Sequence, residues 1–342
     1  MLKKVIALVV TVFIISNLIA STAFVLMSDN ERTTKNDIII DDQEIISDKF
    51  LYYHGVKIVW LEEAAFRITS GDLVVYIDPY MVSSDAEKAD IIICTHHHGE
   101  HFSLTDVIRV RDGNTSLYTP KPDPSIDGIG PTPEELFTLG FRNVSFVQPG
   151  MVVNHSGTIL EFVPAYNIDK FNPNTGQPWH PRWANWTGVI VEIGGTRIYH
   201  SGDSDHIPEM EKIDCDIFLA PVGGVGVMTA KEAAEAVESL KKTSDLKYAI
   251  PMHYTYFPGM TSPYLPATEF AAKANCTVVI LKPEWMTETS TTYSSIVTDT
   301  CETSQVTSNG GQSSSPVTTT AFGIVTLIIV FSIYSTRRKS RK

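Results

Sequence analysis

Short β-branched runs recur through the middle of this 342-residue chain, and they constrain its fold more than any other feature. Most are four to seven residues long and are bounded by Gly, Pro, Asp or Asn, which is typical of strands between turns. The expected strands are Val56–Trp60, Leu73–Ile77, Ile91–Cys94, Val144–Val147, Ile159–Val163, Gly188–Ile193, Arg197–His200, Ile217–Ala220, Ala249–Pro251 and Val278–Leu281. Such a pattern predicts a strand-rich α/β body.

Helical periodicity is confined to fewer stretches of this body. Helices are expected over Pro133–Leu139, with Thr132 as the N-cap, and over Ala230–Leu240 and Ala267–Ala274. We find no internal sequence repeat, although two β-rich halves are compatible with the order of the elements.

The composition divides the chain into a folded body and two polar flanks. Residues 28–49 are polar and charged and indicate a spacer, and residues 287–316 are dominated by Ser and Thr and indicate a stalk. The body is therefore expected at 50–286, the size of one large domain. The net charge of −12 argues against a nucleic-acid partner, which would need clustered Lys and Arg.

Both ends of the chain carry membrane signals. Lys3 and Lys4 precede an apolar run that makes 1–27 either a signal peptide, cut after Ala23, or a signal anchor. Residues 317–335 are uncharged and are followed by a basic tail at 336–342, which predicts a transmembrane helix with its tail in the cytoplasm. A buried core helix is the alternative for this run, but it would not explain the basic tail.

This topology places the body on the extracellular face of a cell membrane. Five Asn-x-Ser/Thr sequons agree with a glycoprotein on that side: Asn114, Asn143, Asn154, Asn185 and Asn275.

The four cysteines do not form a metal-binding pattern, because no Cys-x-x-Cys pair is present. Cys94 and Cys215 lie in apolar strand contexts and are expected to be buried. Cys276 and Cys301 are candidates for a disulfide.

Polar residues that can bind a metal follow four of the expected strands. Asp78 ends one run, His96–His101 follows the next, and Asp203 and His253 follow two later ones. Loops at the carboxyl ends of strands usually build the site of an α/β protein, so these residues are expected to meet.

The segment Thr95-His96-His97-His98-Gly99-Glu100-His101 is the strongest chemical signal. Imidazole and carboxylate together suit zinc first, with manganese and iron as alternatives, and the pattern allows one ion or two. A His-rich surface tract is the alternative, and the buried run before the segment argues against it.

His96-x-His98-x-Glu100-His101 resembles the His-x-His-x-Asp-His signature of the metallo-β-lactamase fold superfamily. Later segments agree in order: Val163–Asn167, Tyr199–Asp205, Leu219–Gly224 and Pro251–Tyr254. The resemblance covers about 50–286 and is closest to the branch that contains L-ascorbate-6-phosphate lactonase. It implies a four-layer αββα sandwich.

The resemblance also implies roles for the polar residues. His96 and His98 would bind one metal, Glu100, His101 and His253 the other, and Asp203 both. Asp78 would support a ligand through a hydrogen bond. Asp203, Glu100 and Asp78 are the carboxylates expected to serve catalysis, in which a metal-activated water attacks the substrate.

Three departures from the family pattern bear on these roles. Glu100 replaces an Asp, Asn167 replaces the His that completes the first metal site, and Glu62-Glu63 replaces a Gly-His pair. Because a neutral amide is a poor zinc ligand, the first site is expected to bind its metal more weakly than the second, unless His180 takes the place of Asn167. The alternative for His180 is a loop residue near the substrate mouth.

The remaining polar and aromatic candidates receive simpler assignments. His97, His200 and His206 are expected to pack or to support ligands. The long loop after Asn167 carries four aromatic residues that either pack or cover a substrate: Phe171, Trp179, Trp183 and Trp186.

Together these features predict a membrane-anchored, outward-facing hydrolase that cleaves an ester, lactone or phosphodiester bond in a small molecule. A degenerate relative that serves as a cell-surface binding module is the main alternative, and a purely structural envelope protein is a third.

Overall fold

The first of two sheets takes in the N-terminal half of the described chain. The computed structural model describes residues 38–41, 44–123, 130–254 and 264–286. Nine strands lie in sequence order in this sheet, antiparallel from β1 to β6 and parallel from β6 to β9. They are β1 (Ile38–Asp41), β2 (Glu44–Ile46), β3 (Phe50–Tyr53), β4 (Val56–Glu62), β5 (Ala65–Ser70), β6 (Leu73–Ile77), β7 (Ile91–Ile93), β8 (Ser116–Pro120) and β9 (Asn143–Val147).

The second sheet repeats this plan. Its seven strands again lie in sequence order, antiparallel from β10 to β13 and parallel from β13 to β16. They are β10 (Val152–His155), β11 (Thr158–Pro164), β12 (Thr187–Ile193), β13 (Thr196–His200), β14 (Ile217–Pro221), β15 (Tyr248–Met252) and β16 (Thr277–Val278). The two β-rich halves that the order of elements allowed are therefore present.

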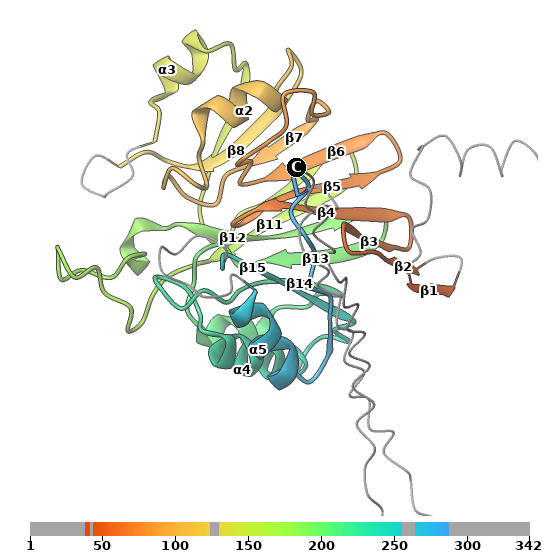
Figure 1. Cartoon of the computed structure of the whole chain (residues 1–342). Coiled ribbons are helices and arrows are strands. Elements are labelled where there is room, and N and C mark those ends of the chain that lie inside the picture. The colour runs from red at the N-terminus through yellow and green to blue at the C-terminus, as the bar shows by residue number, and fades with distance from the viewer. Residues whose placement is uncertain (1–37, 42–43, 124–129, 255–263, 287–342) are drawn as a thin grey trace, which may run out of the picture. The chain divides into compact units, whose positions relative to one another are not determined.

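Helices cover the outer faces of the parallel parts of both sheets, because parallel strands need crossover connections. The crossovers of the first sheet contain α2 (Leu104–Val110) and α3 (Pro133–Thr138), and those of the second contain α4 (Ala230–Leu240) and α5 (Leu265–Lys273). Short 3-10 helices are η1 (Arg182–Ala184) and η2 (Pro208–Lys212). In Figure 1 the order is helices, sheet, sheet, helices, which is the expected four-layer αββα sandwich.

The helix starts follow from local sequence. Thr132 caps α3 and Thr229 caps α4, each in a capping box with the Glu three residues later. Ser103 caps α2 by accepting a hydrogen bond from the backbone N–H of Asp106. Each of these helices therefore begins at the residue after its cap.

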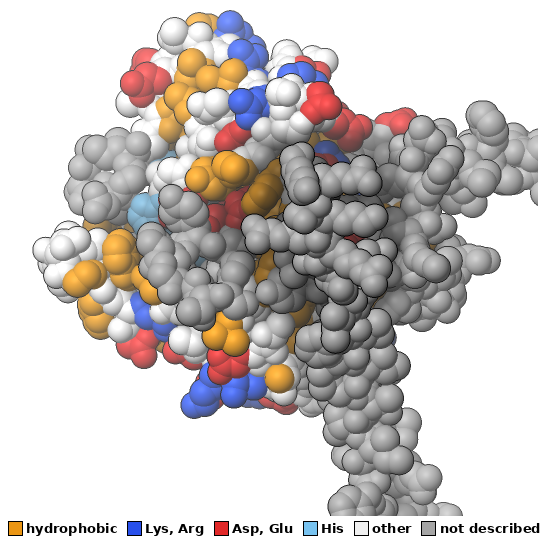
Figure 2. All heavy atoms as spheres, in the orientation of Figure 1, with side chains coloured by type: hydrophobic (Ala, Val, Ile, Leu, Met, Phe, Trp, Pro, Cys, Tyr) orange, Lys and Arg blue, Asp and Glu red, His pale blue; other side chains and the backbone are white. Residues whose placement is uncertain are grey.

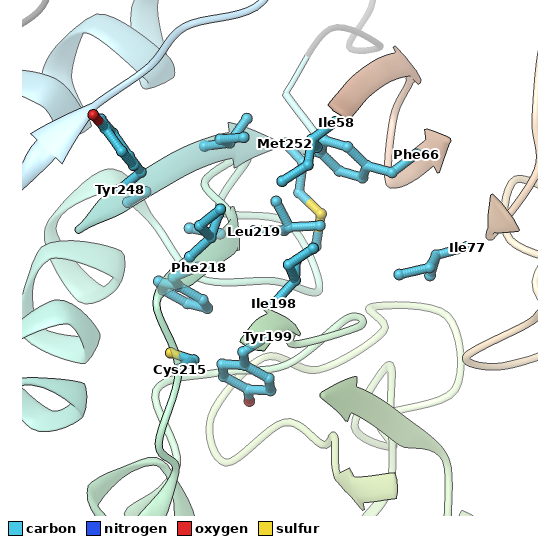
Figure 3. Close-up of a cluster of buried hydrophobic side chains, with 14 of the residues drawn as sticks. Ile58, Phe66, Ile77, Ile198, Tyr199, Cys215, Phe218, Leu219, Tyr248 and Met252 are labelled. Atoms are coloured by element: carbon cyan, nitrogen blue, oxygen red, sulfur yellow. The ribbon is translucent and has the colours of Figure 1, made fainter. Parts of the chain in front are cut away.

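The larger of two apolar cores lies between the sheets and extends under α4 and α5. Ile58 and Phe66 come from β4 and β5, and Leu219 and Met252 come from β14 and β15. All four side chains are fully buried, and Figure 3 shows them in one cluster. A smaller core lies under α2 and α3. Each such side chain contributes roughly 1.5–3 kcal/mol on burial, so this shared core holds the two sheets together.

The structure departs from the expected boundary of this body. β1 and β2 lie within residues 28–49, which the sequence assigns to a polar spacer, so the sheet begins before residue 50. Most expected strands and helices are present within one or two residues. The strand expected at Val278–Leu281 is only Thr277–Val278.

Several expectations fall on residues that the structure does not describe: the signal peptide or anchor at 1–27, the stalk at 287–316, the transmembrane run at 317–335 and the tail at 336–342. Among the described residues, no helix combines the length and apolar character needed to cross a membrane. Cys94, Cys215 and Cys276 are buried, as expected for the first two. The disulfide considered for Cys276 involves Cys301, which lies outside the described ranges.

Candidate metal centre

A single carboxylate oxygen lies among four imidazoles at the carboxyl ends of the strands. Asp203 Oδ2 is 3.1 Å from Nε2 of His253, 3.3 Å from that of His101, 3.4 Å from that of His180 and 3.9 Å from that of His96. Asp203 is 3% exposed. A charge buried this deeply needs compensation from its neighbours.

The turn after β13 brings Asp203 to this position. Gly202 precedes it with φ +59°, and a Cβ there would lie 2.8 Å from the carbonyl oxygen of Thr187. The turn therefore requires glycine.

Three histidines form the first group of potential ligands. His96 Nε2 is 3.0 Å from His98 Nδ1, and His180 Nε2 is 3.2 Å from the same atom. Nitrogens bound to one tetrahedral zinc ion at 2.0–2.1 Å would lie about 3.3 Å apart. The spacing in this group therefore fits a single ion.

The second group of potential ligands contains two further imidazoles and a carboxylate. Glu100, His101 and His253 each offer an atom within 4.8 Å of the others. His101 and His253 are buried and Glu100 is half-buried. The structure thus places together every residue that the sequence proposed as a metal ligand.

Hydrogen bonds fix the orientation of two of these imidazoles. The carboxylate of Asp78 lies 2.7 Å from His101 Nδ1, and it also accepts hydrogen bonds from the backbone N–H and the hydroxyl of Thr95. Since the Thr95 hydroxyl donates to Asp78, its oxygen accepts from His96 Nδ1 at 3.1 Å. With Nδ1 of both imidazoles engaged in these hydrogen bonds, Nε2 of each is turned to the centre.

His180 lies where the family pattern expects the third imidazole of the first site, which Asn167 does not supply. Asn167 Oδ1 accepts from the backbone N–H and from Nδ1 of His180, each at 2.9 Å, and Asn167 Nδ2 donates to Asp205 and to the carbonyl of Gly226. His180 Nδ1 also lies 2.9 Å from the carbonyl oxygen of Gly226. Both neighbours of Nδ1 are acceptors, so His180 also turns an unprotonated Nε2 to the centre.

This arrangement changes the expectation for the first site. The site was expected to be weaker because Asn167 would be its third ligand. Asn167 instead points its amide away from the cluster and holds His180, so the first group has three imidazoles. This geometry favours the alternative stated for His180, and it removes the reason for expecting two sites of unequal strength.

A buried ion pair holds the loop that carries Asn167. Asp205 accepts from the backbone N–H groups of Ile168 and Asp169, and it pairs with Lys170 at 2.9 Å. Lys170 also pairs with Glu232 of α4 at 3.0 Å. The position of His180 thus depends on contacts with α4.

Backbone strain gathers at the cluster. Glu63, Asp78 and His253 have φ values of +47°, +47° and +55°, in the left-handed region that favours glycine. Such residues cost of order 1–3 kcal/mol each and are typical of functional sites. The strain indicates that the positions of these side chains matter more than the conformational cost of their backbone.

Burial and charge shift the pKa values of the cluster in opposite directions. Burial lowers the pKa of His180 to about 3 and that of His96 well below its usual value. Burial also opposes protonation of His253, but Asp203 and then Glu63 raise its pKa to about 9. The pKa of His101 is raised by Asp203 and Asp78 against the effect of burial. Positive charge is thus favoured beside Asp203.

The cluster fits divalent metal ions. His101 Nε2, His253 Nε2 and Asp203 Oδ1 are buried and have no hydrogen-bond partner among the described residues. Buried polar atoms are seldom left unsatisfied, and cations between them would satisfy all three. Nitrogen and carboxylate donors suit zinc, manganese or iron.

The other candidate residues mostly take the simpler roles. His97 bonds to Thr119, His200 bonds to the carbonyl of Ala64, and His206 bonds to Ser239. Trp186 is buried against the first group, with ring centroids 4.9 Å from His96, 5.1 Å from His98 and 5.6 Å from His180. Phe171 and Trp183 are about half exposed. In Figure 2 histidine reaches the visible surface only in a small patch, in keeping with this burial.

The sandwich and its histidine and carboxylate cluster together define a hydrolase of the metallo-β-lactamase type. Comparison with known families agrees: a model described as the beta-lactamase superfamily domain matches residues 57–253, and the chain belongs to that superfamily.

The relatives that match this chain within the superfamily are metal-dependent hydrolases. The chain is 30% identical over 261 residues to a UPF0173 metal-dependent hydrolase of Cupriavidus metallidurans, covering 67% of this chain and 82% of the relative. It is 29% identical over 223 residues to a UPF0173 metal-dependent hydrolase of Carboxydothermus hydrogenoformans, covering 59% and 86%. Our chain is a metal-dependent hydrolase of this superfamily.

A solved structure supports the same class. A protein of Parabacteroides distasonis classified as a metal-dependent hydrolase is 25% identical, with a TM-score of 0.51, and the match covers 66% of this chain and 94% of that one. These names do not support the narrower resemblance to the L-ascorbate-6-phosphate lactonase branch.

Proposed function

We propose that this chain cleaves an ester, lactone or phosphodiester bond in a small molecule, with two divalent ions held around Asp203. The observation that carries the proposal is the convergence of four Nε2 atoms on Asp203 Oδ2 at 3.1–3.9 Å. Spacings near 3.3 Å are those of ligands that share an ion.

The donor set assigns the ligands in two groups. His96, His98 and His180 would hold one ion, His101, His253 and Glu100 the other, and Asp203 both. Zinc is the ion we propose first, with manganese and iron as alternatives. When bound, the ions supply Lewis acidity towards the scissile group and lower the pKa of water at the site towards ~7.

The chain's own residues prepare the site for that chemistry. Asp78 and Asn167 keep the Nδ1 protons of His101 and His180 turned away from the centre. Trp186 packs against the first group and excludes water from that side. Ligands held in this way bind without reorganising, which favours both affinity and rate.

Metal content and hydrolysis should be measured together on the purified full-length protein. We expect two ions per chain and turnover of at least one member of a panel of lactones, carboxylic esters, phosphodiesters and thioesters. Protein that holds two ions and is inactive on the whole panel would favour the binding-module alternative. Protein that binds no ion would exclude the proposed site.

We also propose that the chain is anchored in a cell membrane, with its body on the extracellular face. The support is the apolar runs at 1–27 and 317–335 and the basic tail at 336–342. All five sequon asparagines are exposed, so glycans on Asn114, Asn143, Asn154, Asn185 or Asn275 would not disturb the core.

The topology predicts that protease added to intact cells digests the body, while an epitope placed after residue 342 stays protected. Detergent-permeabilised cells provide the control, since there both parts should be digested. Digestion of the body only after permeabilisation would contradict the proposed orientation.

Glu100→Asp tests whether the longer side chain is adapted to this site. Glu100 lies in the second ligand group with His101 and His253, and the substitution withdraws its carboxylate by about one C–C bond, ~1.5 Å. We expect metal affinity and kcat/KM to fall about tenfold, because ligand positions tolerate only about 0.5 Å. Glu134→Asp, on exposed α3, is the matched control. A gain in activity would show instead that Glu100 is a defect.

A further inference from the structure

Glu63 is a buried carboxylate that the ligand assignment leaves unused. Its side chain is 6% exposed, and its Oε1 has no hydrogen-bond partner among the described residues. A buried carboxylate oxygen without a hydrogen-bond donor is costly. Something at this position must compensate for it.

The turn that carries Glu63 is attached to the metal cluster. Glu63 lies between β4 and β5 with φ +47°, and its carbonyl oxygen accepts from the backbone N–H of His253 and from Nε1 of Trp60, both at 2.9 Å. These two bonds fix the turn against the loop after β15. They bring Glu63 Oε2 to 3.6 Å from His253 Nδ1.

His253 lacks a hydrogen-bond acceptor for its Nδ1, just as Glu63 lacks a donor for Oε1 of its carboxylate. Its Nε2 faces Asp203 at 3.1 Å, so an ion there would leave the proton on Nδ1. His253 Nδ1 is buried and has no hydrogen-bond partner among the residues described. The unsatisfied donor and the unsatisfied carboxylate therefore face each other.

At His101, a carboxylate already accepts a hydrogen bond from the Nδ1 of a proposed ligand. The carboxylate of Asp78 lies 2.7 Å from His101 Nδ1, and Asp78 also has a positive φ, +47°. Carboxylate, imidazole and metal in sequence raise the basicity of the imidazole and fix its orientation. Glu63 stands in the corresponding relation to His253, one short side-chain movement from a hydrogen bond.

We propose that Glu63 is a positioning residue that accepts the Nδ1 proton of His253 and thereby holds His253 as a metal ligand. The inference rests on the proposed function, because it assigns Glu63 to the second metal site. Glu62, its neighbour, is engaged elsewhere: its Oε2 accepts from Nε1 of Trp285 at 2.7 Å.

Three variants of the full-length protein separate positioning from folding. Glu63→Gln keeps an oxygen that can accept from Nδ1, Glu63→Leu removes it at similar size, and Glu63→Gly removes it and relieves the positive φ. Glu62→Leu is the matched control in the same turn. The readouts are Zn²⁺ affinity by chelator competition, the visible absorption spectrum with Co²⁺, and the melting temperature of the metal-free protein.

We expect Glu63→Leu and Glu63→Gly to weaken Zn²⁺ binding about 10–100-fold at one site and to change the Co²⁺ spectrum. Glu63→Gln should stay within a few-fold of the wild type. Metal-free Glu63→Gly should melt at the wild-type temperature or above, because glycine adopts this φ freely and a buried charge is lost.

Wild-type affinity and spectrum in Glu63→Leu would overturn the proposal, as would an equal loss in Glu62→Leu. If Glu63→Gly lowers the melting temperature, the Zn²⁺ affinities of Glu63→Gln and Glu63→Leu decide between positioning and folding, since both variants keep a side chain at the strained position. Wild-type protein that binds no ion would instead refute the proposed function, so the two failures are distinguishable.

Discussion

Asp203→Asn is expected to cause the largest loss of activity of any single change, at least about 100-fold in kcat/KM. One oxygen of Asp203 lies within 3.1–3.9 Å of all four Nε2 atoms, so the carboxylate would serve both ions. Asparagine keeps the size but removes the charge that offsets the two cations. Loss of a supporting residue alone typically costs about 10–100-fold, and loss of a shared ligand should exceed that.

Bound metal and steady-state kinetics should be measured on the same preparation of Asp203→Asn. Asp214→Asn is the matched control, because Asp214 is exposed and its nearest cation is Arg197 at 3.7 Å. Activity within tenfold of the wild type, with two ions retained, would contradict the central position of Asp203.

His180→Ala is expected to reduce the bound metal from two ions per chain to one. His180 completes a three-nitrogen group with His96 and His98, and two imidazoles alone hold an ion weakly. Activity should fall about 10–100-fold. Isothermal titration of the metal-free variant with Zn²⁺ should show one tight step where the wild type shows two.

Asn167→Ala should reproduce this loss in weaker form, because it removes the acceptor that holds His180. His155→Ala is a suitable control. His155 lies in β10, and its side chain bonds to Tyr118, which is not a proposed ligand. Two equally tight steps in His180→Ala would show that another residue completes the first site.

Periodicity and motif spacing predict most of the metal site, because each ligand follows a recognisable strand. The runs before Asp78, His96, Asp203 and His253 are short, apolar and β-branched, and parallel strands place their carboxyl ends at one edge. The αββα architecture itself came from the family resemblance.

The residues that sequence reasoning left open depend on loop conformation. His180 is thirteen residues beyond Asn167, and only the fold of the intervening loop shows that it faces Asp203. The signal available was its place in a Pro-rich, Trp-rich loop, which cannot specify a side-chain direction. Glu63 was noted only as a departure, because its burial follows from the turn contact with His253.

Strands at the edges and strands with mixed polarity were also missed. β5 contains Arg67, Thr69 and Ser70, and its pattern lacks the β-branched run used to find strands. β1 and β2 lie in a segment rich in charged residues. Tertiary pairing stabilises such strands where local propensity is weak.

The ligands come from both sheets, and this links metal supply to the lifetime of the folded chain. His96, His98 and His101 follow the first sheet, whereas His180, Asp203 and His253 belong to the second. Any ion in the site therefore crosslinks the two halves of the sandwich. Free metal at 100 times its dissociation constant would add about 2.7 kcal/mol to stability. A body of this kind would resist proteases where metal is plentiful and would be cleared sooner where it is scarce.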